Sequence, residues 1–141
     1  MDKVLIVDGH SAIFSTPQLA QDHLQHATRT RLELIRELTH FQDVSDYYVV
    51  LVFDGKGEKL DTVMRQDLDI LVMYSRTNQT ADAVIERIVA QHAEKFDVEV
   101  ASNDRHVLDT ISVFGAFPMS IRRMWELIDS IWLGAAKFML A

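Results

Sequence analysis

The stretch Val4-Leu-Ile-Val-Asp8-Gly9 decides the fold of this chain. Its continuous aliphatic run, closed by a turn glycine, is typical of a strand that is buried on both faces. Strands of that kind belong to parallel sheets whose two faces are covered by helices. The segment from Lys3 to Asp8 therefore predicts the first strand of such a sheet, with an aspartate at its carboxyl end.

The rest of the chain alternates between strand-like and helix-like segments. Further buried strands are predicted at Tyr47–Phe53, Ile70–Tyr74 and Val98–Ala101, with a minor edge strand at Val113-Phe114. Strands that alternate with helices imply parallel crossover units. The sequence thus predicts the α/β class, a three-layer α/β/α sandwich with a mainly parallel central sheet. The helices are expected from about Leu19 to Phe41, over about 80–95, from near Asp104 to before Gly115, and over about 120–133.

The composition fits one globular domain. The 141 residues are close to the most common domain size, and 48% hydrophobic with 25% charged residues is ordinary for a soluble fold. No low-complexity stretch suggests a linker, so we expect a single domain over residues 1–141. The chain has no cysteine, which excludes disulfides, thiolate metal sites and cysteine nucleophiles.

Charge and hydropathy limit the partners. A net charge of −7 disfavours a general nucleic-acid coat protein, because phosphate affinity normally comes from an excess of Lys and Arg. An acidic nuclease can still hold its substrate through metal ions and local arginines. The apolar runs near both ends are too short to cross a bilayer, so we expect a cytoplasmic protein without membrane contact. The apolar tail 134–141 is suited either to packing on its own sheet or to forming a homodimer.

Acidic residues collect where the predicted strands end. Asp8, Asp54 and Asp104 follow three separate strands, and Asp82 opens the helix that begins near Thr80. The carboxyl ends of parallel strands meet at one edge of a sheet, where open α/β folds bind ligands. Carboxylates held close together there repel one another unless a cation or protons compensate. Hard divalent ions prefer oxygen ligands, and they make phosphate chemistry the leading hypothesis.

Each aspartate taken singly also has a structural explanation. Asp8-Gly9 and Asp54-Gly55 are common turn dipeptides. In the first turn of a helix a carboxylate is favoured by capping and by the helix dipole, by about 0.3–1 kcal/mol. Turns and caps do not, however, require an acid after three strands at the same edge of one sheet. The coincidence of place favours a functional cluster.

Other side chains near this edge are candidates for supporting roles. Glu86 lies one helical turn after Asp82, so it is either a metal or water ligand or the partner of a neighbouring arginine. Ser11 either orients a water or ligand or bonds to the loop backbone. Basic side chains near the same edge are candidate contacts for a phosphate backbone, with surface solvation as the alternative. The favoured ones are Lys56, Arg105 and Arg122.

The order of these motifs resembles that of the YacP-like NYN domains, which belong to the PIN-like nuclease superfamily. The resemblance runs from Lys3 to about Ile128, and its most specific part is the Thr-Ala-Asp helix start with the Ile-Glu that follows. The motifs that carry it are Val4-Leu-Ile-Val-Asp8-Gly9-His10-Ser11, Val52-Phe-Asp54, Asn78-Gln-Thr-Ala-Asp82-Ala-Val-Ile-Glu86-Arg87, Val100-Ala-Ser-Asn-Asp104-Arg105 and Phe114-Gly-Ala116.

The resemblance implies a PIN-like fold whose clustered acids bind Mg²⁺ or Mn²⁺ and cleave RNA internally. It makes Asp8, Asp82 and Asp104 the principal metal ligands, with Glu86 as a further one and Asp54 orienting a water. The hypothesis is therefore a metal-dependent endoribonuclease with catalytic aspartates at positions 8, 54, 82 and 104. The family usually has asparagine where this chain has Ser11, and serine is the shorter side chain.

Two other functions are alternatives. A non-catalytic module that binds RNA or protein would keep the fold and lose the ions. A receiver-like phosphoacceptor domain would use Asp8 as its first acid and Asp54 as the acceptor. Against it, Gly9 stands where a receiver has its paired acid, and Asn103-Asp104 stand where a lysine is expected.

Overall fold

One parallel sheet forms the centre of the molecule. The computed structural model describes residues 1–55 and 70–140, and for residues 132 and 135–140 the backbone alone. Every pair of neighbouring strands is parallel, in the order β3-β2-β1-β4-β5. The predicted α/β class is confirmed, and the sheet is parallel throughout. The strands are β1 (Lys3–Asp8), β2 (Tyr47–Phe53), β3 (Leu71–Tyr74), β4 (Asp97–Ala101) and β5 (Phe117–Met119).

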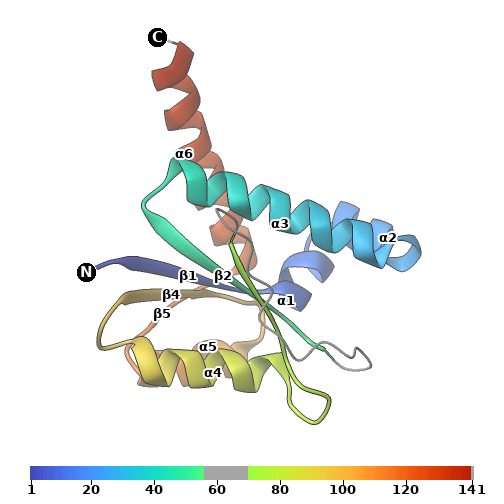
Figure 1. Ribbon diagram of the computed structural model, residues 1–141, viewed down its shortest axis with the longest axis vertical. Helices are drawn as coiled ribbons and strands as arrows, with labels where there is room; N and C mark the ends of the chain where they lie inside the picture. The colour runs from blue at the N-terminus through green and yellow to red at the C-terminus, as the bar shows by residue number, and fades with distance from the viewer. Residues whose placement is uncertain (56–69, 141) are drawn as a thin grey trace.

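Helices cover both faces of this sheet and complete three layers (Figure 1). On one face lie α1 (Gly9–Phe14), α2 (Pro17–Gln25), α3 (Ala27–Val44) and α6 (Ile121–Leu140). On the other face lie α4 (Ala81–His92) and α5 (Arg105–Val113). In Figure 1 all strands point their carboxyl ends away from the N-terminus, toward the side on which α1 begins.

Three local expectations were wrong. No helix was predicted directly after β1, where the short helix α1 begins, and the long helix expected from Leu19 to Phe41 is two helices. They are separated at His26, whose φ of −141° and ψ of 65° are not helical. The minor strand expected at Val113-Phe114 lies at Phe117–Met119 instead, because α5 runs to Val113 and the chain then turns at Gly115 with φ +93°.

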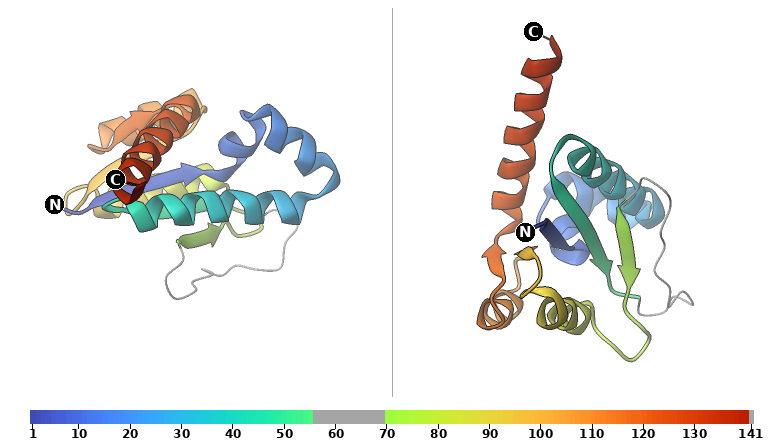
Figure 2. Two further views of the ribbon diagram at one scale, coloured as in Figure 1. Left: turned by 90° about the horizontal axis from the view of Figure 1, so that it is seen from above. Right: turned by 60° about the vertical axis from the view of Figure 1, so that its left-hand side comes forward.

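The last helix is longer than predicted. It passes through Gly134 and continues to Leu140, so the expected end at about 133 was too early. Its C-terminal turns project beyond the sandwich (Figure 2). A homodimer through this apolar segment finds no support in the fold and stays a prediction. In the part of the chain that the structure describes, no helix combines the length and the hydropathy that a membrane span needs.

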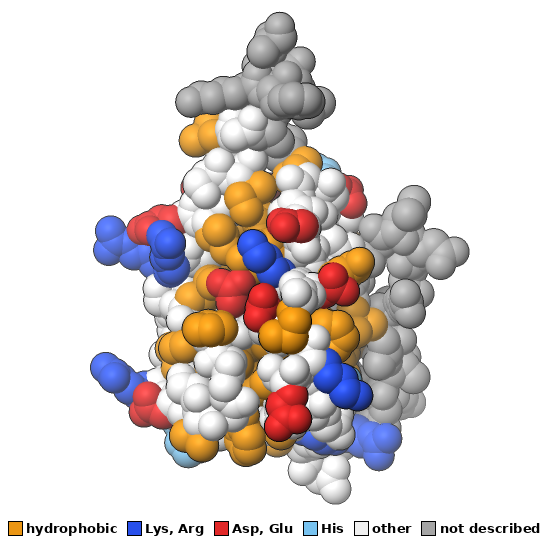
Figure 3. Space-filling view, turned by 90° about the vertical axis from the view of Figure 1, so that its left-hand side faces the viewer, with side chains coloured by type: hydrophobic (Ala, Val, Ile, Leu, Met, Phe, Trp, Pro, Cys, Tyr) orange, Lys and Arg blue, Asp and Glu red, His pale blue; other side chains and the backbone are white. Residues whose placement is uncertain are grey.

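The surface at the amino edge of the sheet carries both positive and negative charges. On the face around the N-terminus, acidic and basic side chains are mixed with hydrophobic ones (Figure 3). The acidic residues singled out from the sequence lie toward the opposite edge, where the strands end.

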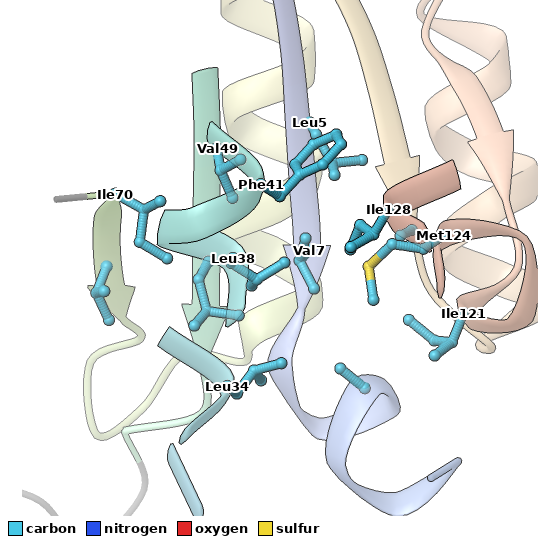
Figure 4. Close-up of a cluster of buried hydrophobic side chains, with 14 of the residues drawn as sticks. Leu5, Val7, Leu34, Leu38, Phe41, Val49, Ile70, Ile121, Met124 and Ile128 are labelled. Atoms are coloured by element: carbon cyan, nitrogen blue, oxygen red, sulfur yellow. The ribbon is translucent and has the colours of Figure 1, made fainter. Parts of the chain in front are cut away.

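The larger of two hydrophobic cores fixes the position of β1. In Figure 4 the side chains of Leu34, Leu38 and Phe41 on α3 approach those of β1 from one side, and side chains of α6 approach from another. Spacings of three and four residues place the core residues of each helix on one face. This packing holds the end of β1, and the aspartate there, in a fixed position. The α6 residues are Ile121, Met124 and Ile128.

Candidate active site

The strand order reverses beside β1, and this reversal indicates where a ligand is expected to bind. The chain leaves β1 for β2 and β3 on one side, then crosses to β4 and β5 on the other. Open α/β sheets bind ligands at the carboxyl ends of strands at such a reversal. Asp8 is the last residue of β1, and Ser102 directly follows β4. The expected ligand site therefore lies between the segments that carry these two residues.

The Asp8 carboxylate is buried, with 4% of the residue exposed. Its Oδ2 accepts hydrogen bonds from the hydroxyls of Ser11 and Ser102, each at 2.8 Å. Its Oδ1 accepts a longer bond of 3.4 Å from the Ser11 amide. A buried carboxylate needs such donors, since an unpaired one is strongly unfavourable. Asp8 is thus a carboxylate held in one orientation by two hydroxyl groups.

Both serine hydroxyls are themselves positioned by the loop after β4. The Ser11 hydroxyl accepts a hydrogen bond from the Asn103 amide at 3.1 Å. The Ser102 hydroxyl accepts one from the Asp104 amide at 3.0 Å. Sequence reasoning singled out Ser11 but missed Ser102 and Asn103, because serine and asparagine are ordinary turn residues. Their place between the end of a strand and Asp104 was the one available signal.

Asp104 and Asp82 both lie at the beginning of helices. Asp104 caps α5, and its Oδ1 accepts hydrogen bonds from the amides of His106 at 2.9 Å and Val107 at 3.4 Å. Asp82 is the second residue of α4, which Thr80 caps by accepting from the Ala83 amide at 3.1 Å. The capping role expected for an acid at this position is therefore present at Asp104.

The pKa of Asp82 responds to burial and to three other acids. Burial raises the pKa of Asp82 to about 6 from an ordinary value of 3.8. The negative charges of Asp8 and Asp104, a hydrogen bond with Asp104 and the charge of Glu86 also raise this pKa. Asp8, Asp104 and Glu86 thus lie near enough to Asp82 for their charges to raise its pKa, although the four acids come from β1, α4 and the loop after β4.

Asp54 lies at the same edge, at the end of the neighbouring strand β2. Its side chain is exposed, and its Oδ1 accepts a hydrogen bond from the Ser75 hydroxyl at 3.3 Å. The same hydroxyl accepts a bond from the Gly55 amide at 3.0 Å, so Asp54 is tied to the end of β3.

The predicted phosphate contacts have different surroundings. Arg105 is the exposed first residue of α5 and directly follows Asp104. Arg122 lies in the first turn of α6 and forms an ion pair with Glu126 at 3.4 Å. Lys56 lies outside the described residues. An exposed ion pair contributes little to stability, so the Glu126 pair does not hold Arg122 firmly.

The donor set fits a hard divalent cation in chemistry and charge. Over residues 1–55 and 70–140, no three Asp, Glu or His side chains already stand close enough together to enclose a metal ion. The oxygen donors are nevertheless those that Mg²⁺ and Mn²⁺ prefer. Burial and the negative charges of Asp8, Asp104 and Glu86 raise the pKa of Asp82, so the ionised form of this carboxyl group is disfavoured. A cation held there would relieve this repulsion after adjustment of the side chains.

Comparison with known proteins decides the family. The model of the family described as the YacP-like NYN domain matches residues 5–137 of the chain. The chain belongs to the YacP-like NYN domain family. This YacP-like NYN domain is 29% identical to the uncharacterized protein YacP of Bacillus subtilis (strain 168) over 133 aligned residues. The aligned region covers 91% of this chain and 76% of that protein. The resemblance noted from the motifs is confirmed.

Solved structures show the same fold. The crystal structure of Rae1 (YacP) from Bacillus subtilis matches this YacP-like NYN domain with a TM-score of 0.79 and 26% identity, over 99% of this chain and 80% of that one. A mutant form of Rae1 matches with the same TM-score at 24% identity, over 95% of this chain and 79% of that one. The receiver alternative fails on topology, because receivers have the strand order 2-1-3-4-5.

Proposed function

We propose that this domain is a metal-dependent endoribonuclease that hydrolyses phosphodiester bonds in RNA. The observation that carries the proposal is that burial and the negative charges of Asp8 and Asp104 together raise the pKa of Asp82, at the edge of the sheet where the strands end. The family supports it, because NYN domains are generally nucleases. The position of the acids at the reversal of strand order supports it as well.

Each acid has a distinct role in this proposal. The two serine hydroxyls hold the Asp8 carboxylate still, so it acts as a preorganised group. Asp8, Asp82 and Asp104, together with Glu86, would hold Mg²⁺ or Mn²⁺. When bound, such a cation lowers the pKa of water and neutralises charge that develops on the scissile phosphate. Asp54, one strand away, orients the attacking water.

Basic side chains place the RNA backbone. Arg105 follows Asp104 directly, and Arg122 begins the helix that packs on the other face of the sheet. Both are exposed. Lys56 has the same role in the proposal. Phosphate contacts of this kind position the substrate and carry no sequence information.

The test measures cleavage of end-labelled single-stranded RNA in Mn²⁺ and in EDTA. Wild-type protein should cleave only with the metal, and Asp8→Asn and Asp82→Asn should each lower the rate by about 100-fold or more. Asp43→Asn is the matched control, because Asp43 is an exposed acid at the end of α3, at the amino edge of the sheet. Cleavage indifferent to EDTA and to both site substitutions would rule out the proposal.

A non-catalytic RNA-binding module is the second candidate. This function is favoured by the distances between the acids, because no three of them within the described ranges stand close enough together to hold a metal ion. Calorimetric titration with Mn²⁺ separates the two functions. Heat of binding that disappears in Asp8→Asn supports the nuclease, and no heat at millimolar metal supports the module.

A further inference from the structure

Three aromatic rings form a row on α1 and α2, beginning beside the acidic site. The rings of His10 and Phe14 lie 4.5 Å apart, centroid to centroid, with a 37° angle between their planes. The ring of His23 on α2 contacts Phe14 edge-on, at 5.2 Å and 79°. His10 is exposed, and Phe14 is 46% exposed. The two rings thus contact each other and are both exposed to solvent, two and six residues after Asp8.

The row starts near the N-terminus of α1, the end of the helix that Asp8 caps. His10 and Phe14 are four residues apart, so they lie on one face of the helix. Side chains on a helix lean toward its N-terminus, which brings the Phe14 ring back over His10. The N-terminus of α1 is capped by Asp8. The row therefore starts two residues from the buried carboxylate.

Several contacts fix α1 in place. Ala12 and Ile13 are buried in the larger core, on the side of the helix away from the rings. The Thr16 hydroxyl, just beyond the helix, donates to the Ala12 carbonyl at 2.8 Å and accepts from the Trp125 indole at 3.2 Å. The rings are thus presented by a helix whose position does not depend on them.

The edge-on contact of His23 orients the Phe14 ring. Nδ1 of His23 is enclosed and has no hydrogen-bond partner in the described structure. This imidazole therefore contributes packing rather than a polar link between α1 and α2. His10 and His23 both contact the Phe14 ring, and 46% of Phe14 remains exposed.

We propose that His10 and Phe14 form a stacking platform for an unpaired base of the substrate, next to the phosphate that is cleaved. This inference rests on the proposed function and narrows its substrate to single-stranded RNA, because a paired base has no free face beside its neighbours. Stacking on aromatic side chains tolerates every base. It also needs no positive charge, which suits a chain with a net charge of −7. Loss of one such ring is expected to weaken binding by about tenfold.

The experiment measures binding of a short single-stranded RNA that carries 2-aminopurine, a base whose fluorescence is quenched by stacking. EDTA is present throughout, so no cleavage occurs. Wild-type protein should quench the probe, and Phe14→Ala should weaken binding about tenfold and remove the quench. Phe14→Tyr should retain both. Phe114→Ala is the matched control, because Phe114 is 47% exposed on a different surface at the end of α5.

A second variant separates stacking from packing. Phe14→Leu keeps an apolar side chain but has no π-face, so it should fold with an unchanged melting temperature and lose the quench. No quench by wild-type protein, or an equal quench by Phe14→Leu, overturns the inference. If the platform exists but the nuclease proposal is wrong, the quench persists while Mn²⁺ produces no cleavage. If only the platform is wrong, Mn²⁺ supports cleavage that is unaffected by Phe14→Leu.

Discussion

Asp82 shows how burial and neighbouring charge act on one residue. Its pKa of about 6 means that the folded protein still binds a proton between about pH 4 and pH 6, where the unfolded chain has released it. A group with a raised acidic pKa therefore makes folding less favourable as pH rises through this window. Above about pH 6 the full unfavourable contribution is present.

Replacing Asp82 by asparagine should consequently stabilise the metal-free protein at neutral pH. In EDTA at about pH 7 to 8, we expect Asp82→Asn to raise the melting temperature by about 2–4 °C. At about pH 4 the gain should vanish, because wild-type Asp82 is then protonated. Thermal melts across this range measure the effect, with Asp43→Asn as control. A gain of the same size at both ends of the range would contradict the assignment.

Ser102 should be among the most sensitive polar residues. Ser102→Ala removes one of the two hydroxyl donors to Asp8 and leaves the Asp104 amide without its acceptor. Buried groups that lose a partner cost about 1–3 kcal/mol each, so the free energy of unfolding should fall by at least this much. Urea unfolding measures it. Ser130→Ala, which removes an exposed hydroxyl bonded within α6, should change stability by less than about 0.5 kcal/mol.

The sequence predicted at which edge of the sheet the acids lie, but not the contacts that orient them. The edge could be predicted because the carboxyl ends of parallel strands share it, and Asp8 and Asp104 follow the neighbouring strands β1 and β4. The hydroxyls of Ser11 and Ser102 contact Asp8 through side-chain directions and loop geometry, which no spacing rule specifies. Arg122 could be placed near a helix start, but its pairing with Glu126 depends on rotamers.

Among the helices and strands, the hydrophobic pattern of the sequence correctly predicted those that are long or fully buried. The strands through Leu5, Leu51 and Val100 were predicted because continuous aliphatic runs have few other uses. The helix α1 was missed because its six residues begin at a turn-like Asp-Gly pair and are held by the tertiary fold. The break between α2 and α3 at His26 could not be predicted, because no proline or glycine lies there in the sequence.

Two glycines should respond in opposite directions to the same substitution. A Cβ at Gly55, between β2 and the segment after β3, would lie 2.1 Å from the Ser75 carbonyl oxygen. Gly55→Ala should therefore destabilise the protein by about 1–3 kcal/mol, the usual cost of overpacking. A Cβ at Gly134 on α6 would meet nothing within 4 Å, so Gly134→Ala should stabilise by about 0.5–1 kcal/mol. Denaturant unfolding of both variants checks the pair, and equal signs would contradict it.

For the whole molecule, a bound cation should appear as added stability. A ligand that binds only the folded state at a hundredfold excess over its Kd adds about 2.7 kcal/mol to the free energy of unfolding. Mn²⁺ at millimolar concentration should therefore raise the melting temperature of wild-type protein at neutral pH and leave that of Asp8→Asn unchanged. Sodium chloride at equal ionic strength is the control. Equal shifts in both proteins would show that no ion is held by Asp8.

The distance along the chain between Asp8 and its partner also has a consequence for biosynthesis. The hydrogen bond from Ser102 joins residues 94 positions apart, and the first of them leaves the translation machinery early. A nascent polypeptide therefore contains Asp8 long before Ser102 is available to donate a hydrogen bond to it. A chain that has not yet emerged as far as position 102 therefore lacks one of the two hydroxyl groups that orient the Asp8 carboxylate.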